Sequence, residues 1–132
     1  MRRLTDETVL AVGRLTLAAA ELEYLLAGIG ASRADGDLAA IFTAPGEPLR
    51  VARRSAQLTP PDRRDEFVGL IEAAATYLVQ SRTAVRAMWF ENGLVSVATF
   101  DEISSLILRC RDRLQALLDE SDRTPAALPR SR

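Results

Sequence analysis

Apolar residues recur at steps of three and four over several long stretches of the chain, and this is the period of an amphipathic α-helix. The first such stretch covers about residues 6–27, where Thr5 is suited to cap the helix. Gly28 and Gly30 are expected to end it. Its apolar positions form one stripe: Val12, Leu15, Ala19, Leu22, Leu26 and Ile29.

Two short helices are expected next. Residues 31–36 have the composition of a loop, and residues 37–43 and 49–58 are each long enough for a short helix. The segment 45–48 holds two prolines and a glycine, and it is expected to separate these two short helices.

A second long helix is predicted from about Pro60 to Met88, with Thr59 as its cap. Its main apolar face holds six residues: Phe67, Ile71, Ala74, Leu78, Val85 and Trp89. A second apolar stripe on the same helix lies beside this face and leads into Arg82 and Arg86. This helix is therefore expected to pack on two sides, within one subunit or against a partner.

The chain after this helix carries a turn signal at residues 91–94. The flanks, 89–90 and 94–97, either pair as a short hairpin or belong to an irregular loop. A last helix is expected over about 101–119, capped by Thr99. Its core face is formed by Ile103, Leu106, Cys110, Leu114 and Leu117.

These elements predict an all-α fold. We expect a small up-and-down helical bundle with two long helices, short connecting helices, a possible short hairpin and a C-terminal helix. A length of 132 residues fits one domain, residues 1–120. The polar segment 121–132, with two prolines and little periodicity, is expected to be a disordered tail.

Composition narrows the possible chemistry. The formal net charge is −1, so any anion-binding site has to be a local patch. All 17 basic residues are arginine, which reflects either a coding bias or planar contacts to carboxylates and phosphates. The chain has no histidine, the usual general acid and base near neutral pH. No metal site and no cofactor is expected.

The single cysteine, Cys110, excludes an internal disulfide and suggests a small core residue in a reducing compartment. No signal peptide is visible at the start of the chain, and no apolar run reaches the ~18 residues of a membrane span. We therefore expect a cytoplasmic protein that does not contact membranes.

The segment from Ser81 to Trp89, together with Gly13-Arg14 and Glu21-Leu22-Glu23 in the first helix and Gly93, resembles the HEPN domains, which are compact helical proteins found in many toxins and defence ribonucleases. In that family the second long helix ends in Arg-Asn, three residues, His, two residues and Trp. The resemblance covers about residues 5–120 and implies a homodimer.

Trp89 sets the preferred register of this motif. Ser81 then stands at the position of the family's catalytic Arg, Arg82 at the Asn and Arg86 at the His. A second register keeps Arg82 as the family Arg, puts Ala87 at the His position and loses the Trp spacing. Either register removes the histidine, and an arginine cannot act as a base because its guanidinium group stays protonated and only donates hydrogen bonds. The resemblance therefore implies a non-catalytic relative.

Arg82 and Arg86 lie one helical turn apart and neighbour each other on the helix surface. They either form structural ion pairs, with Glu21 or Glu23 of the first helix as partners, or bind an anion. Trp89 is expected to pack in the core, with base stacking as the alternative. The predicted binding residues are therefore Ser81, Arg82, Arg86 and Trp89.

Two functions remain open at this point. One is a homodimeric HEPN-like protein that binds RNA, a nucleotide or a protein partner in a defence, toxin–antitoxin or regulatory setting. The other is a helical interaction or assembly module with no nucleic-acid role. The Arg82→Ala/Arg86→Ala double substitution discriminates between them, because only the first requires these charges for ligand binding.

Overall fold

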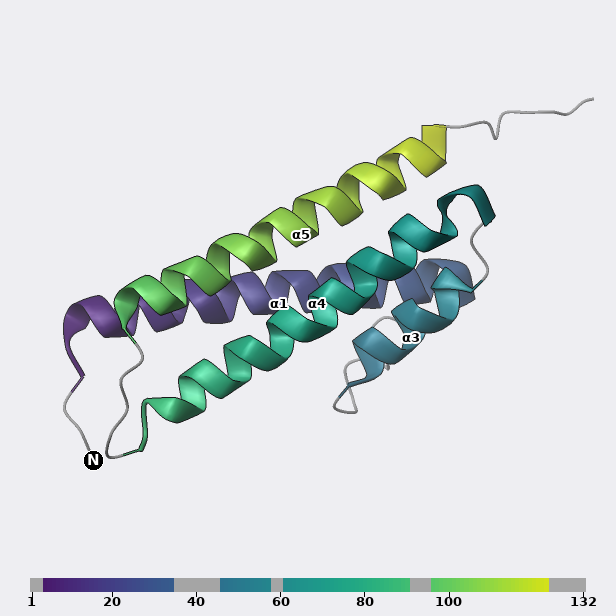
Figure 1. Ribbon diagram of the computed structural model, residues 1–132. Coiled ribbons are helices and arrows are strands. Elements are labelled where there is room, and N and C mark those ends of the chain that lie inside the picture. Colours follow the sequence, from purple (N-terminus) through teal and green to yellow (C-terminus); the bar gives the residue numbers. More distant parts are fainter. Residues whose placement is uncertain (1–3, 35–45, 58–60, 91–95, 124–132) are drawn as a thin grey trace, which may run out of the picture.

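The computed structural model describes four helices and confirms the all-α bundle (Figure 1). It describes residues 4–34, 46–57, 61–90 and 96–123, and the side chains of these ranges other than 30–34 and 121–123. The helices are α1 (Asp6–Ala34), α3 (Glu47–Ala56), α4 (Pro61–Ala87) and α5 (Val97–Arg123). Within these ranges the chain forms no strand, and no helix is both long enough and apolar enough to cross a bilayer.

The three long helices alternate in direction. α1 and α5 begin at the same end of the molecule and α4 runs the opposite way, while the short α3 lies beside the C-terminal half of α1 (Figure 1). α1 packs chiefly against α5 and α3, and α4 packs chiefly against α5. Direct contact between α1 and α4 is slight, and α3 packs between them at one end of the molecule.

One apolar core runs along the long helices. Its largest fully buried side chains are Phe67, Phe100, Leu15, Leu22, Leu26, Ile71, Ile107 and Leu114. Each side chain of this size stabilises the fold by about 1.5–3 kcal/mol through burial alone. This core holds α4 in place, and α4 carries the residues that the sequence singled out.

α1 is longer than predicted. It continues through Gly28 and Gly30 to Ala34, so the expected end of the helix at these glycines was wrong, and part of the expected loop is helical. Ala27 and Ile29 are buried in this last section. Their packing outweighs the cost of a glycine inside a helix, which is only about 1 kcal/mol.

α3 begins earlier than predicted. Glu47 and Pro48 belong to its first turn, so the expected break at 45–48 was wrong for these two residues. Gly46 precedes the helix with φ 80°, a left-handed conformation that glycine adopts without strain. Pro48 fits there because the first N–H groups of a helix have no partner within it. The predicted helix at 37–43 lies outside the described residues.

The chain between α4 and α5 also differs from the prediction. Trp89 and Phe90 continue α4 as a turn, with their N–H groups bonded to the Arg86 and Ala87 carbonyl oxygens at 3.0 and 3.3 Å. Val97 is helical, so these three residues form no hairpin strand. The predicted turn at 91–94 lies outside the described residues.

α5 extends beyond the predicted helix at both ends. Ser96 caps it in place of the expected Thr99, because the Ser96 Oγ accepts the Thr99 N–H at 3.2 Å. The helix continues to Arg123, so residues 121–123 of the predicted tail are helical. The rest of that tail, 124–132, and the expected cap Thr59 lie outside the described residues.

The buried face of α4 turns away from the predicted one in its last two turns. Phe67, Ile71, Ala74 and Leu78 are buried as expected, but the stripe then continues through Ser81, Ala84 and Met88. Trp89 is 56% exposed, so its predicted core packing was wrong. The buried positions after Leu78 advance by three, three and four residues, so the buried stripe drifts around the helix, and Trp89, one residue after Met88, lies about 100° away from it.

Candidate functional site

A cleft of about 780 Å³ lies between α1, α3 and α4. Ser81, Arg82 and Arg86 line it from α4, while Glu23 lines it from α1 and Arg53 from α3. We call it the arginine cleft. Its volume falls in the range of small-molecule sites, about 300–1,000 Å³. The structure therefore brings together three of the four predicted binding residues with one of the two predicted acidic partners.

α4 positions the three side chains by its helical period. Ser81 continues the buried stripe that starts at Phe67, so its side chain faces inward. Arg82 comes one residue later and Arg86 one turn after Arg82, and both are exposed. The cleft thus has a buried hydroxyl at its wall and two guanidinium groups at its rim.

Neither Arg82 nor Arg86 forms an ion pair with any residue that the structure describes. The expected partner Glu21 instead pairs with Arg111 of α5. Glu23 lies in the cleft wall without an ion pair to either arginine. The direct ion pairs predicted between these arginines and α1 are not formed.

Arg53 differs from the two α4 arginines because its charge is already matched. Its Nε and Nη2 atoms donate to the two carboxylate oxygens of Glu72, both at 2.7 Å. This hydrogen bonding lowers the pKa of the Glu72 carboxyl below its usual value. The positive charge left for a ligand in the arginine cleft is therefore that of Arg82 and Arg86.

Ser81 is 5% exposed, and its hydroxyl has no hydrogen-bond partner within the described part of the chain. The Ser81 Oγ is not one of the fully buried side-chain atoms that lack a partner, so this hydroxyl stays open to the cleft. A bound molecule in the cleft can therefore form a hydrogen bond with Ser81. The sequence placed Ser81 beside the apolar face, but only the packing of α3 against α1 makes it part of a cavity.

Trp89 stands at the end of the same surface of α4. It follows Arg82 by two turns and Arg86 by one, and its ring is largely exposed. An exposed indole offers an apolar face on which a flat ring can stack. Trp89 does not line the arginine cleft itself, so it can contact only a ligand that extends beyond the cleft.

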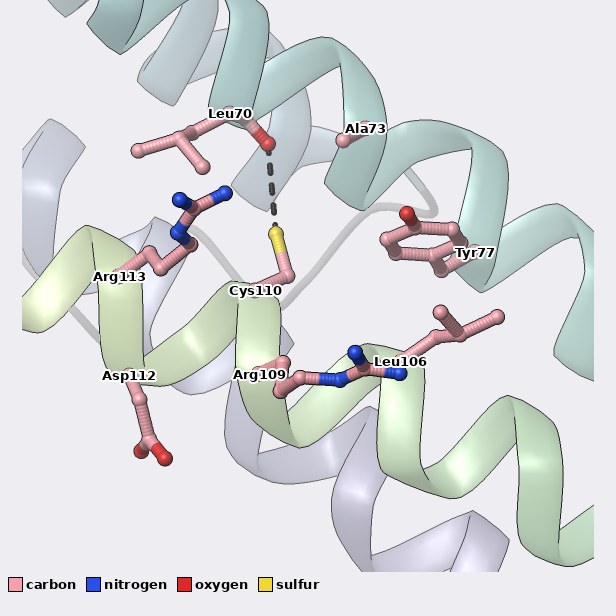
Figure 2. Close-up of a pocket in the computed structure, with 8 residues that line it drawn as sticks. All are labelled: Leu70, Ala73, Tyr77, Leu106, Arg109, Cys110, Asp112 and Arg113. Carbon is pink, nitrogen blue, oxygen red and sulfur yellow. Dashed lines mark hydrogen bonds between the residues drawn. The ribbon is translucent and has the colours of Figure 1, made fainter.

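A second hollow, of about 520 Å³, lies along the contact between α4 and α5. We call it the seam hollow. Figure 2 shows Leu70 and Tyr77 of α4 facing Arg109 and Arg113 of α5, with Cys110 between them. The Cys110 thiol donates to the Leu70 carbonyl oxygen at 3.4 Å.

Burial raises the pKa of the Cys110 thiol to about 11. Near neutral pH this thiol is therefore protonated, and it is neither a nucleophile nor a metal ligand. The residues in the described ranges also contain no cluster of three or more His, Cys, Asp or Glu side chains placed to hold a metal ion.

No family model matches this chain, and the comparisons with curated proteins and with solved structures gave no significant match either.

Proposed function

We propose that this protein binds a phosphate-bearing ligand, a nucleotide or a nucleotide unit of single-stranded RNA, in the arginine cleft, and that it does so without catalysis. The observation that carries the proposal is the combination in one cavity of two arginines without ionic partners and a serine hydroxyl that forms no hydrogen bond, among the residues described. The resemblance of residues 81–89 to the HEPN motif supports the same site.

The chemistry of the cleft favours a nucleotide over a simple anion. Arg82 and Arg86 supply guanidinium groups, which match the oxygens of a phosphate in pairs of hydrogen bonds. Glu23 on the opposite wall can only accept hydrogen bonds when ionised. A nucleotide offers both a phosphate and, at a distance from it, donors in the ribose hydroxyls and the exocyclic amines, whereas inorganic phosphate has to bring its negative charge close to Glu23 to contact it.

RNA can use the surface beyond the cleft as well. Trp89 lies one turn past Arg86, where a base next to the bound nucleotide can stack on the indole. Base stacking on an aromatic side chain contributes about 1–3 kcal/mol and tolerates any base. We therefore propose binding with little sequence preference.

The absence of catalysis follows from the side chains present. The chain has no histidine, and the two arginines stay protonated and can only donate hydrogen bonds. Glu23 enters the proposal only as an acceptor of hydrogen bonds from the ligand. We therefore propose a binding or regulatory role for a HEPN-like protein, with the cytoplasm as its expected location.

The test compares two arginine pairs of equal spacing and charge. Fluorescence anisotropy with a labelled single-stranded RNA and with a labelled mononucleotide should show that Arg82→Ala/Arg86→Ala weakens binding by about 10- to 100-fold, since each charged hydrogen bond contributes about 1.5–3 kcal/mol before losses. The matched control is Arg109→Ala/Arg113→Ala in the seam hollow, which should change affinity by less than about threefold.

The salt dependence gives a second readout. Single-stranded RNA loses affinity with a slope of about 0.7 per neutralised phosphate on logarithmic axes. The Arg82→Ala/Arg86→Ala variant should therefore lower the slope by about 1.4 if the two arginines neutralise two phosphates. Equal losses in both arginine double variants would mean that RNA responds only to overall charge, and the proposed site would be abandoned.

The register of the motif has its own test. The triple substitution Ser81→Arg, Arg82→Asn and Arg86→His restores the HEPN pattern and should produce RNA cleavage where the parent has none. Ser81 is buried, so circular dichroism must show that the variant remains helical. A folded triple variant without cleavage would count against the preferred register while leaving the binding proposal standing.

A further inference from the structure

The outward face of α1 carries large apolar side chains that no described helix covers. Leu10, Leu17 and Tyr24 are 62%, 72% and 60% exposed. They follow one another at intervals of seven residues and so lie along one line of the helix. The exposed Gly13 and Ala20 fall between them at the intervening positions. These five residues form what we call the α1 outer stripe.

This pattern is typical of a helix that packs side by side with a second helix. Seven-residue spacing with a second set of positions in between matches the contact line along which two helices pack side by side. The small residues at the second set allow the axes to come close, and a Cβ atom at Gly13 would meet no atom within 4 Å, so the surface above it is open. The stripe points away from the core residues Leu15 and Leu22.

The charges beside the stripe identify the partner. Arg14 and Glu21 follow Leu10 and Leu17 by four residues each and therefore lie on the same edge of the stripe. Arg14 pairs with Asp101 at 2.9 Å and Glu21 pairs with Arg111, yet the side chains of both remain more than half exposed. This edge therefore presents a positive and a negative group in a fixed order.

A second copy of the chain can pack antiparallel to the first, with the two-fold axis near Leu17. Arg14 of each copy then lies beside Glu21 of the other copy. A parallel pair does not form these contacts, because the edge residues of parallel helices meet the opposite edge of the partner, which here holds Val9 and Thr16. We propose that the protein forms a two-fold symmetric antiparallel dimer through the α1 outer stripe.

The size of this contact predicts its strength. At 1.5 Å per residue, the stripe from Leu10 to Tyr24 is about 21 Å long. A single helix pair of that length falls near or below the lower end of specific interfaces, about 1,200 Å² in total. The dimer should therefore dissociate in the micromolar range, and it should be visible as a concentration-dependent equilibrium.

The inference does not depend on the proposed ligand. The arginine cleft is lined from α1 by Ala19, Glu23 and Leu26, which do not belong to the α1 outer stripe. A protein that dimerises but binds no RNA would leave this inference intact, and a monomer that binds RNA would leave the proposed function intact.

Sedimentation equilibrium over a range of protein concentrations tests the dimer. Leu17→Glu should weaken association by at least about tenfold, because it places two like charges near the two-fold axis. Phe90→Glu, at an exposed apolar residue outside the stripe, is the matched control and should change association by less than about twofold. A chain that stays monomeric at all concentrations, or a dimer indifferent to Leu17→Glu, would overturn the proposal.

Disulfide cross-linking tests the orientation. Leu17→Cys should form a disulfide with its own copy under mild oxidation, because the residue lies near the two-fold axis. Leu10→Cys should not cross-link to itself, but a mixture of Leu10→Cys and Tyr24→Cys should cross-link across the pair. The native Cys110 is buried and should not contribute. Self-linking of Leu10→Cys as efficient as that of Leu17→Cys would contradict the antiparallel arrangement.

Discussion

Two pairs of arginines each border a cavity, and within each pair the two residues are one helical turn apart. The two cavities differ in the polar groups that line them. Arg82 and Arg86 border the arginine cleft, whose wall contains the hydroxyl of Ser81, with no hydrogen-bond partner among the described residues. Arg109 and Arg113 border the seam hollow, where the polar atom between the helices, the Cys110 thiol, is already bonded to a carbonyl oxygen (Figure 2).

This difference shows that charge and spacing do not define a site by themselves. Both pairs present similar guanidinium groups to solvent, and both sit over an apolar floor. In the arginine cleft the hydroxyl of Ser81 stands directly beside Arg82 on the same helix, whereas in the seam hollow the hydroxyl of Tyr77 lies on the helix opposite Arg109 and Arg113 (Figure 2). A ligand in the arginine cleft can therefore meet both arginines and the hydroxyl on one surface of α4.

The largest expected effect concerns the leucine side chains that line the two cavities. Leu78 is buried in the arginine cleft, and Leu70 is half-buried in the seam hollow. Leu78→Ala should lower the free energy of unfolding by about 2–4 kcal/mol, and Leu70→Ala by about 1 kcal/mol, because the lost burial is smaller there. Urea denaturation measures both. Equal losses would show that the two floors belong equally to the core.

The second expected effect concerns the Cys110 thiol. Its pKa of about 11 lies above the ordinary value of 9.0, so folding favours the protonated form. Its alkylation near pH 8 should be about 100-fold slower than that of an exposed control, Gln115→Cys, and should accelerate as the pH rises toward 11.

The same shift makes a signed prediction for stability. A pKa that is raised in the folded state contributes stability that is complete below about pH 9 and is lost as the pH rises toward about 11. The unfolding free energy of the parent should therefore fall relative to that of Cys110→Ala across this window. Parallel pH profiles of the two proteins would contradict the burial of the thiol.

A smaller effect is expected from the carboxylate of the arginine cleft. Glu23→Gln removes the negative charge that faces Arg82 and Arg86 across the cavity. Binding of pyrophosphate should strengthen several-fold, by about 1 kcal/mol, with a mononucleotide gaining less because it loses an acceptor for its donors. Isothermal titration calorimetry measures both ligands. Asp112→Asn beside the seam hollow is the control and should leave both affinities unchanged.

The smallest effect separates two of the buried serines, Ser81 and Ser104. The Ser104 Oγ donates to the Phe100 carbonyl oxygen at 2.9 Å, so Ser104→Ala should cost about 1 kcal/mol. Ser81→Ala removes a hydroxyl without a described partner and should change stability by less than about 0.5 kcal/mol, while still weakening ligand binding. A loss of stability for Ser81→Ala as large as that for Ser104→Ala would show that the Ser81 hydroxyl is already satisfied in the free protein.

The sequence by itself determined the helical class, the two long helices with the C-terminal helix, and most of their buried faces. Leu15, Leu22, Ile71 and Leu114 were predicted correctly because helical periodicity is a local property, readable within a few turns. It also placed Ser81, Arg82 and Arg86 side by side, since their spacing on one helix fixes their neighbourhood. The ends of the helices were predicted less well, because packing beyond Gly28 and capping by Ser96 outweighed the local signals.

Only the tertiary structure decided what those side chains face. Glu21 and Glu23 are two residues apart on α1, yet one reaches Arg111 of α5 and the other lines the arginine cleft. α3, whose place no pattern in the chain predicts, closes the cavity and brings in Arg53. Partners on different helices depend on how those helices pack and rotate, which is a sum of many contacts along the whole core and not a property of any one segment.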